Sequence, residues 1–125
     1  MLKPISTSKA PAAVGPYSQG MQAGSFIYVS GQLPINPSNG ELIKEDIKLA
    51  TKQSLENAKA ILEEAGASLN DVVKVTVFLA DMRQFADMNS VYAEYFTDHK
   101  PARAAFEVAN LPLYADVEIE MIAYK

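Results

Sequence analysis

The sequence predicts a single α+β domain in which a mixed β-sheet carries two helices on one face. Runs rich in β-branched and aromatic residues alternate with two longer stretches whose apolar residues recur every three or four positions. Their order along the chain is β-β-α-β-α-β-β, and short right-handed crossovers place both helices on the same side. The chain has 125 residues, of which 49% are hydrophobic, so residues 1–125 are expected to form one domain with its own core.

The N-terminal part is expected to form a hairpin after an irregular arm. Pro11 and Gly15-Pro16 predict an extended or looping arm over the first residues of the chain. A strand from Tyr17 to Ala23 and a β-rich run from Phe26 to Ser30 flank the turn signal Gly24-Ser25. Two such runs around a short turn predict an antiparallel pair.

A helix is predicted from about Asp46 to Ala65, after a loop from Pro34 to Gly40 that closes in a tight turn at Asn39-Gly40. Asp46 can cap the first turn of this helix, and Gly66 ends it. Its apolar face comprises Leu55, Ala58, Ile61, Leu62 and Ala65.

The second half of the chain is predicted to form a strand, a helix and two further strands. Val72 to Ala80 has strand alternation, and Asp81 can cap a helix that runs to about Phe96. The last two strands are predicted at Ala104 to Val108 and at Val117 to Tyr124. One side of the first strand comprises Val73, Val75, Val77 and Leu79, and the apolar face of the helix comprises Phe85, Met88, Val91, Tyr92 and Tyr95.

The face of the sheet opposite the helices, here called the outer face, mixes aromatic and polar side chains. Strand alternation places on it Phe26, Tyr28, Ser30, Thr76, Phe78, Glu118, Glu120 and Tyr124. Such a surface is too apolar to leave entirely hydrated, so self-association through it is expected. A monomer with a partly apolar exposed sheet is the alternative.

Composition excludes several classes of function. Cysteine is absent and His99 is the one histidine, so neither a disulfide, a thiolate or histidine-rich metal site nor a cysteine nucleophile is expected. A net charge of −4 disfavours nucleic acid as a partner. The longest apolar run is too short to span a membrane and the N-terminus lacks a signal-peptide core, so a soluble cytoplasmic protein is expected.

Arg103 and Glu118 are the leading candidates for chemistry, on strands expected to be neighbours. A semi-buried arginine offers a planar fork that fits a carboxylate, and the alternative is a structural ion pair with Glu118 or Glu120. Two carboxylates at positions i and i+2 of one strand repel each other, so one can hold a proton near neutral pH and act as a general acid or base. The alternative for Glu118 and Glu120 is that they belong to a hydrated strand edge and have no catalytic role.

Four further residues are weaker candidates for a ligand site. Ser30 and Gly31 end a strand, where Ser30 supplies a hydroxyl and Gly31 lets the backbone come close to whatever lies beside it. A simple strand-ending turn has the same pattern. Tyr17 can donate a hydrogen bond from its phenol hydroxyl to a ligand, or it can belong to the core or to an interface. Asn89 is a polar residue between apolar helix positions, where it can also cap or bridge.

With these residues in view, the chain resembles the RidA/YjgF family of reactive-intermediate deaminases, also called the Rid or translation-inhibitor L-PSP family. The resemblance runs almost from end to end. It is carried, in order, by Ala10-Pro11-Ala12-Ala13-Val14-Gly15-Pro16-Tyr17-Ser18-Gln19, Val29-Ser30-Gly31-Gln32-Leu33-Pro34, Val73-Lys74-Val75-Thr76-Val77-Phe78-Leu79, Lys100-Pro101-Ala102-Arg103 through Glu107-Val108-Ala109, and Val117-Glu118-Ile119-Glu120.

The resemblance implies a chorismate-mutase-like fold, a homotrimer whose sheets pack into a central barrel, and sites in the clefts between subunits. It implies that Arg103 grips the substrate carboxylate, that Glu118 positions or activates water, and that Tyr17, Ser30, Gly31 and Asn89 line the cleft. The implied reaction is hydrolysis of 2-enamine and 2-imine acids, released by pyridoxal-phosphate dehydratases, to 2-keto acids and ammonia. No cofactor is needed, since the imine carbon is already electrophilic.

One position departs from the family, which commonly has a cysteine two residues after the arginine where this chain has Ala105. The difference removes a thiol and some volume from the cleft, which bears on substrate preference, while Arg103 and Glu118 remain. Two other functions stay open. Relatives are described as ribonucleases or translation inhibitors, and others resemble ligand-binding or regulatory trimers without turnover.

Overall fold

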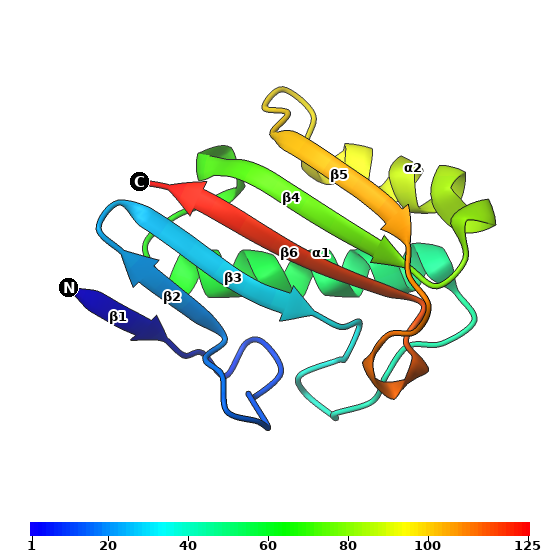
Figure 1. Ribbon diagram of the computed structural model, residues 1–125, viewed down its shortest axis with the longest axis horizontal. Coiled ribbons are helices and arrows are strands. Elements are labelled where there is room, and N and C mark those ends of the chain that lie inside the picture. The colour runs from blue at the N-terminus through cyan, green and yellow to red at the C-terminus, as the bar shows by residue number, and fades with distance from the viewer.

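The computed structural model describes residues 1–125 as a six-stranded sheet with two helices (Figure 1). The strands, in the spatial order β1-β2-β3-β6-β4-β5, are β1 (Leu2–Ile5), β2 (Gly20–Ala23), β3 (Phe26–Gln32), β6 (Val117–Tyr124), β4 (Val72–Leu79) and β5 (Ala102–Glu107). All neighbours pair antiparallel except β4 and β5, which are parallel. The mixed sheet of the predicted α+β fold is thus confirmed.

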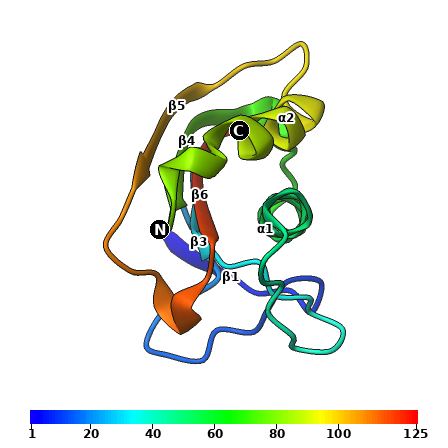
Figure 2. The ribbon, with the colours of Figure 1, turned by 90° about the vertical axis from the view of Figure 1, so that its right-hand side faces the viewer.

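Both helices, α1 (Ile47–Glu64) and α2 (Phe85–Tyr95), cover the same face of the sheet, as the side view shows (Figure 2). The core lies between this face and the helices, where Leu55, Ile61 and Met88 are fully buried. Three short 3-10 helices lie at Leu69–Asp71, Met82–Gln84 and Pro112–Tyr114. Neither helix combines the length and the apolar character that crossing a membrane requires.

Local signals set the ends of α1 where the sequence predicts them. The Asp46 carboxylate accepts the Leu49 N–H at 3.1 Å, which satisfies one of the free donors of the first turn. Gly66 follows the last turn with φ 82°, a left-handed conformation that glycine adopts without a Cβ penalty.

The N-terminal arm differs from its prediction. Leu2–Ile5 forms β1 and pairs with β2 at the edge of the sheet. β2 begins at Gly20 rather than Tyr17, because Gln19 turns its side chain into the arm. There it accepts the Thr7 N–H at 2.6 Å and donates to the Pro11 carbonyl at 2.7 Å.

A β-bulge changes the predicted alternation of β4. The register with β6 shifts between Val72 and Lys74, so Val72 is buried while Val73 is 43% exposed. The expectation that Val73 shares the buried side with Val75 was therefore wrong. The predicted second helix also differs, because the Asp81 side chain caps a 3-10 turn and α2 begins only at Phe85.

The outer face is formed as the alternation predicts, and it is partly exposed. Phe26 pairs with Tyr124 across β3 and β6, and their rings meet edge to face at 5.1 Å. Phe78 and Phe106 meet in the same way at 5.3 Å across β4 and β5. Aromatic side chains thus extend over both halves of the outer face.

Candidate functional site

Glu118 lies on the outer face of β6 beside the bulge that ends β3. The register between β3 and β6 shifts between Val29 and Gln32, and Gly31 lies within this irregularity. A β-carbon on Gly31 would lie 2.5 Å from Oε2 of Glu118, closer than any side chain allows. The absence of a side chain at Gly31 therefore creates the space that the Glu118 carboxyl occupies.

The Glu118 carboxyl is half-buried and forms neither a hydrogen bond nor an ion pair within the chain. Burial raises its pKa above the ordinary value, and the negative charge of Glu120, two residues along the same face, raises it further. A carboxyl in this environment releases and takes up a proton closer to neutral pH than an exposed glutamate does.

Ser30 connects β3 to the segment before β2. Its hydroxyl donates to the Ser18 carbonyl at 2.6 Å, and its N–H donates to the Gln19 carbonyl at 2.9 Å. Tyr17 begins this segment and is 51% exposed, so it is not a core residue of the chain. With its own proton committed to Ser18, the Ser30 hydroxyl is left to accept a hydrogen bond from a ligand.

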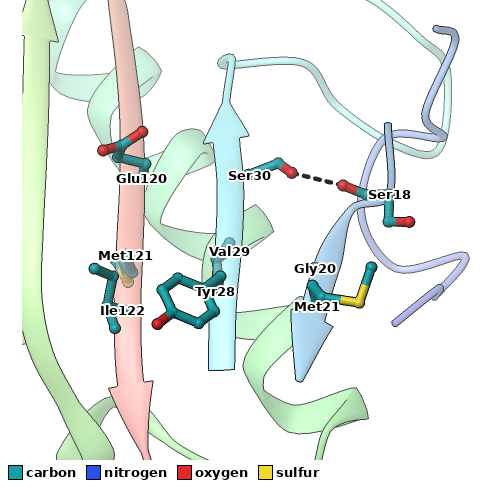
Figure 3. Close-up of a pocket in the computed structure, with 9 residues that line it drawn as sticks. All are labelled: Ser18, Gly20, Met21, Tyr28, Val29, Ser30, Glu120, Met121 and Ile122. Carbon is teal, nitrogen blue, oxygen red and sulfur yellow. Dashed lines mark hydrogen bonds between the residues drawn. The ribbon is translucent and has the colours of Figure 1, made fainter. Parts of the chain in front are cut away.

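An open depression lies on the outer face beside Ser30 (Figure 3). Its lining residues, from β2, β3, β6 and the segment before β2, are Ser18, Gly20, Met21, Tyr28, Val29, Ser30, Glu120, Met121 and Ile122. Glu118 is not one of these lining residues. It lies two residues before Glu120 on the same face and borders Gly31. Ser30, Gly31 and Glu118 thus belong to one region, here called the carboxyl half-site, and Tyr17 precedes Ser18, the residue that Ser30 binds.

Arg103 lies on the edge strand β5 and contacts α2. Its Nη1 donates to Oδ1 of Asn89 at 2.6 Å, so Asn89 bridges to Arg103 rather than capping a helix. The guanidinium carbon lies 4.6 Å from the centre of the Tyr92 ring and 5.5 Å from that of Phe85. Arg103 and Asn89 form a second region, here called the arginine half-site.

The two half-sites lie on opposite faces of the sheet in one chain. Arg103 pairs in register with the buried Val75, whereas Glu118 pairs with Phe78 of the outer face. β4 also separates their strands, so the expectation that these strands are neighbours was wrong. No carboxylate lies within ion-pair distance of Arg103, which contradicts the alternative of a structural ion pair with Glu118 or Glu120.

Apart from Asn89, sequence reasoning did not assign the residues that hold these candidates in place. Phe85, Asn89 and Tyr92 follow one another at i, i+4 and i+7, so a single stripe of α2 faces Arg103. That spacing was visible in the sequence, but it predicted only a core face. Gln19, which is 4% exposed and anchors the arm, is isolated in the sequence, and no periodicity indicates its partners.

Comparison with known proteins gives consistent matches over nearly the whole chain. A RutC family protein of Pyrococcus abyssi is 61% identical over 97% of this chain and 95% of its own length. The 2-iminobutanoate/2-iminopropanoate deaminase of Escherichia coli K12 is 48% identical over 100% of this chain and 99% of its own. The crystal structure of E. coli TdcF with bound serine superposes with a TM-score of 0.94, at 44% identity over 98% of both chains.

The family model described as Endoribonuclease L-PSP matches residues 7–125, which include strands β2 to β6, both helices and the two half-sites. The segments that carry the resemblance in the sequence lie within this range. This chain belongs to the L-PSP family, which is the RidA/YjgF family.

Proposed function

We propose that this protein hydrolyses small 2-imino and 2-enamino acids to 2-keto acids and ammonia, at sites completed by two copies of the chain. The observation that carries the proposal is that Arg103 is held in place but has no acidic partner. Its guanidinium is held by Asn89 and by two aromatic rings, yet no acidic group of its own chain neutralises it. Such an arginine is prepared to bind the carboxylate of a ligand through parallel hydrogen bonds.

The chemistry requires orientation, one water and proton transfer. The carboxylate of the substrate binds Arg103, which fixes the adjacent imine carbon. The imine binds with its nitrogen protonated. Water adds to the imine carbon as its proton passes to the Glu118 carboxylate, which gives a carbinolamine with a neutral amine. Glu118 returns this proton to the amine, and when the carbon–nitrogen bond breaks it takes the proton of the carbinolamine hydroxyl, so that the products are a 2-keto acid and ammonia, which carries the last proton away as ammonium. The raised pKa of Glu118 suits both directions of this transfer.

The opposite placement of the two half-sites supports a site between copies. One chain cannot bring Arg103 and Glu118 to the same ligand, because the sheet separates them. The outer face still exposes Phe26, Tyr28, Phe106 and Tyr124 at 42–54%, a surface that association would bury. A ring of three copies would place the arginine half-site of each edge strand at the carboxyl half-site of the next copy.

The relatives support the same substrate class. One relative carries the name 2-iminobutanoate/2-iminopropanoate deaminase, and the TdcF structure holds serine, a small molecule that also carries a carboxylate beside a nitrogen-bearing carbon. Tyr17, Ser30, Gly31 and Asn89 would line the cleft, as the family resemblance implies. Ala105, at the position where the family commonly has a cysteine, shares the helix-side face with Arg103. Because the chain contains no cysteine, the reaction should not depend on any thiol.

The deciding assay measures 2-oxobutanoate and ammonia as a threonine dehydratase generates 2-aminocrotonate in place. Wild-type protein should accelerate the release of both products, and Arg103→Ala should abolish the acceleration while the variant stays folded. Arg83→Ala is the matched control, because Arg83 is exposed and its guanidinium pairs with Asp81, outside both half-sites. A folded wild-type assembly that gives no acceleration would contradict the proposal.

The second candidate is a binding protein without turnover, which the serine-bound TdcF structure favours. It would use the same arginine and leave Glu118 dispensable. Glu118→Gln distinguishes the two, since the enzyme should lose about 10²–10⁴ of its rate when a proton-transfer group is removed. Ribonuclease activity has less support, because the net charge is −4 and the one histidine, His99, is already engaged at 2.6 Å with the Val72 carbonyl.

A further inference from the structure

The guanidinium of Arg103 is unusual in being ordered by aromatic rings rather than by an acid. β5 is an edge strand and Arg103 is an exposed residue, conditions under which a long side chain normally samples several rotamers. Its one hydrogen bond goes to Asn89 and uses one of five N–H donors. A single bond fixes one atom of the group but not the orientation of its plane.

The rings of α2 supply that orientation. Tyr92 is the nearer, at 4.6 Å from the guanidinium carbon, and it is itself 7% exposed and packed against Phe96 at 4.9 Å between ring centres. Phe85 lies at 5.5 Å and is only partly buried. A cation over a rigid ring face is attracted by the ring quadrupole, and Arg combines this attraction with stacking of its plane.

We infer that Tyr92 is a positioning residue whose ring sets the plane of the Arg103 guanidinium before a ligand arrives. The ring acts through Arg103 and does not need to touch the ligand. Preorganisation of this kind raises affinity because the ordering cost is met before binding. The effect on substrate rests on the proposed function, whereas the ordering of Arg103 does not.

The hydroxyl of Tyr92 makes no contact that could position Arg103. It is buried and has no hydrogen-bond partner. The ring is therefore the part of Tyr92 that serves Arg103, and Tyr92→Phe should preserve the role completely. Tyr92→Leu keeps an apolar side chain in the core but removes the aromatic face.

Nuclear magnetic resonance of arginine Nε tests the ordering directly, because the chain has only two arginines, Arg83 and Arg103. In the ligand-free wild type, Arg103 Nε should show a high heteronuclear Overhauser effect and contacts to the Tyr92 ring protons. Tyr92→Phe should retain the ordered signal and Tyr92→Leu should lose it. The Arg83 signal, from a side chain that is 90% exposed, should not change and serves as the internal control.

Kinetics and binding supply the second readout. Tyr92→Leu should raise KM for the 2-imino acid, and the Kd of 2-oxobutanoate, by about tenfold with kcat nearly unchanged, and Tyr92→Phe should restore both values. A mobile Arg103 in ligand-free wild type would overturn the inference without any variant, as would an ordered Arg103 in folded Tyr92→Leu. Absence of turnover with an ordered wild-type Arg103 would instead contradict the proposed function alone.

Discussion

Gly31 and Glu118 face each other across the β3–β6 pair, and the Glu118 carboxyl fills the space that a side chain at Gly31 would occupy. A β-carbon at Gly31 would lie 2.5 Å from Oε2, 2.8 Å from Cδ and 3.1 Å from Cγ of Glu118. All three atoms belong to a half-buried side chain that has the bulge of β3 on one side and Phe78 in register on the other. The position of Glu118 therefore depends on glycine at residue 31.

Gly31→Ala should displace the Glu118 carboxyl and lower the rate of imine hydrolysis, with much less effect on carboxylate binding. The new methyl group cannot coexist with Glu118 in its present position, while Arg103 lies on the other face of the sheet. We expect a drop of about tenfold or more in kcat, since misplacing a reacting group by about an ångström is costly. Steady-state kinetics and titration with 2-oxobutanoate measure the two effects.

Gly24→Ala is the matched control for that substitution. Gly24 has φ 61° and no atom near its added β-carbon, so alanine there brings backbone strain without a steric contact. It should reduce the free energy of unfolding by about 1 kcal/mol and leave kcat unchanged. Equal losses of kcat in both variants would show that Gly31→Ala acts through stability and not through Glu118.

Glu118→Gln should make the protein more stable at pH 7 while removing activity. Burial and the charge of Glu120 raise the pKa of Glu118 in the folded chain above its value of about 4.5 in the unfolded chain. The folded state therefore holds this proton more tightly, and wild-type stability falls as the pH rises from 4.5 through the raised pKa. Glutamine stays neutral and avoids that loss.

Denaturant unfolding at several pH values measures this difference. The stability advantage of Glu118→Gln should be present at pH 7 and disappear below about pH 4.5, where the wild-type carboxyl is protonated in both states. Glu120→Gln should give a smaller gain, because it removes only the second cause of the shift. A Glu118→Gln variant that is less stable than wild type at pH 7 would contradict the assigned environment of Glu118.

The fold was predictable where local signals decide it. The α1 boundaries follow from Asp46 and Gly66, and the predicted alternation holds along β6 and along β3 up to its bulge after Val29. The sequence could not reveal β1, because Leu2–Ile5 is a strand only through its pairing with β2. It also placed Val73 on the wrong face, since the bulge in β4 arises from its register with β6.

The sequence named the candidate residues, whose roles stay a prediction, but it did not give their arrangement. Arg103 lies with Asn89, and Glu118 lies with Gly31, yet the sequence did not show that β4 comes between the strands of Arg103 and Glu118. That fact depends on parallel pairing of β4 with β5, a non-local contact without a signature in either strand. The separation of Arg103 from Glu118 is the reason for proposing a site between chains.

Tyr28→Glu should disrupt the assembly and abolish activity together. Tyr28 is 45% exposed on the outer face, next to Phe26, and a buried unpaired carboxylate there would oppose association. Leu49→Glu is the matched control, because Leu49 is 50% exposed but lies on α1, on the helix side of the sheet. Sedimentation should show monomer for the first variant and wild-type assembly for the second. A monomeric wild type at micromolar concentration would refute association through this face.

Mixing two inactive variants should restore activity if the cleft combines two copies. Arg103→Ala keeps an intact carboxyl half-site and Glu118→Gln keeps an intact arginine half-site. When the two are unfolded and refolded together at equal concentration, random assembly into trimers gives about a quarter of the clefts both intact halves. The mixture should therefore recover about a quarter of wild-type activity, while each variant refolded alone stays inactive.

A site within one chain predicts a different outcome of the same experiment, because neither variant then contains a complete site in any mixture. Refolding Arg103→Ala with the double variant that carries both substitutions gives the matched control, since no cleft in that mixture has an intact arginine half-site. Recovery in the first mixture and none in the control would place the ligand between the edge strand of one copy and the outer face of another. Such a site couples activity to assembly, because dissociation separates the group that binds the carboxylate from the group that moves the proton.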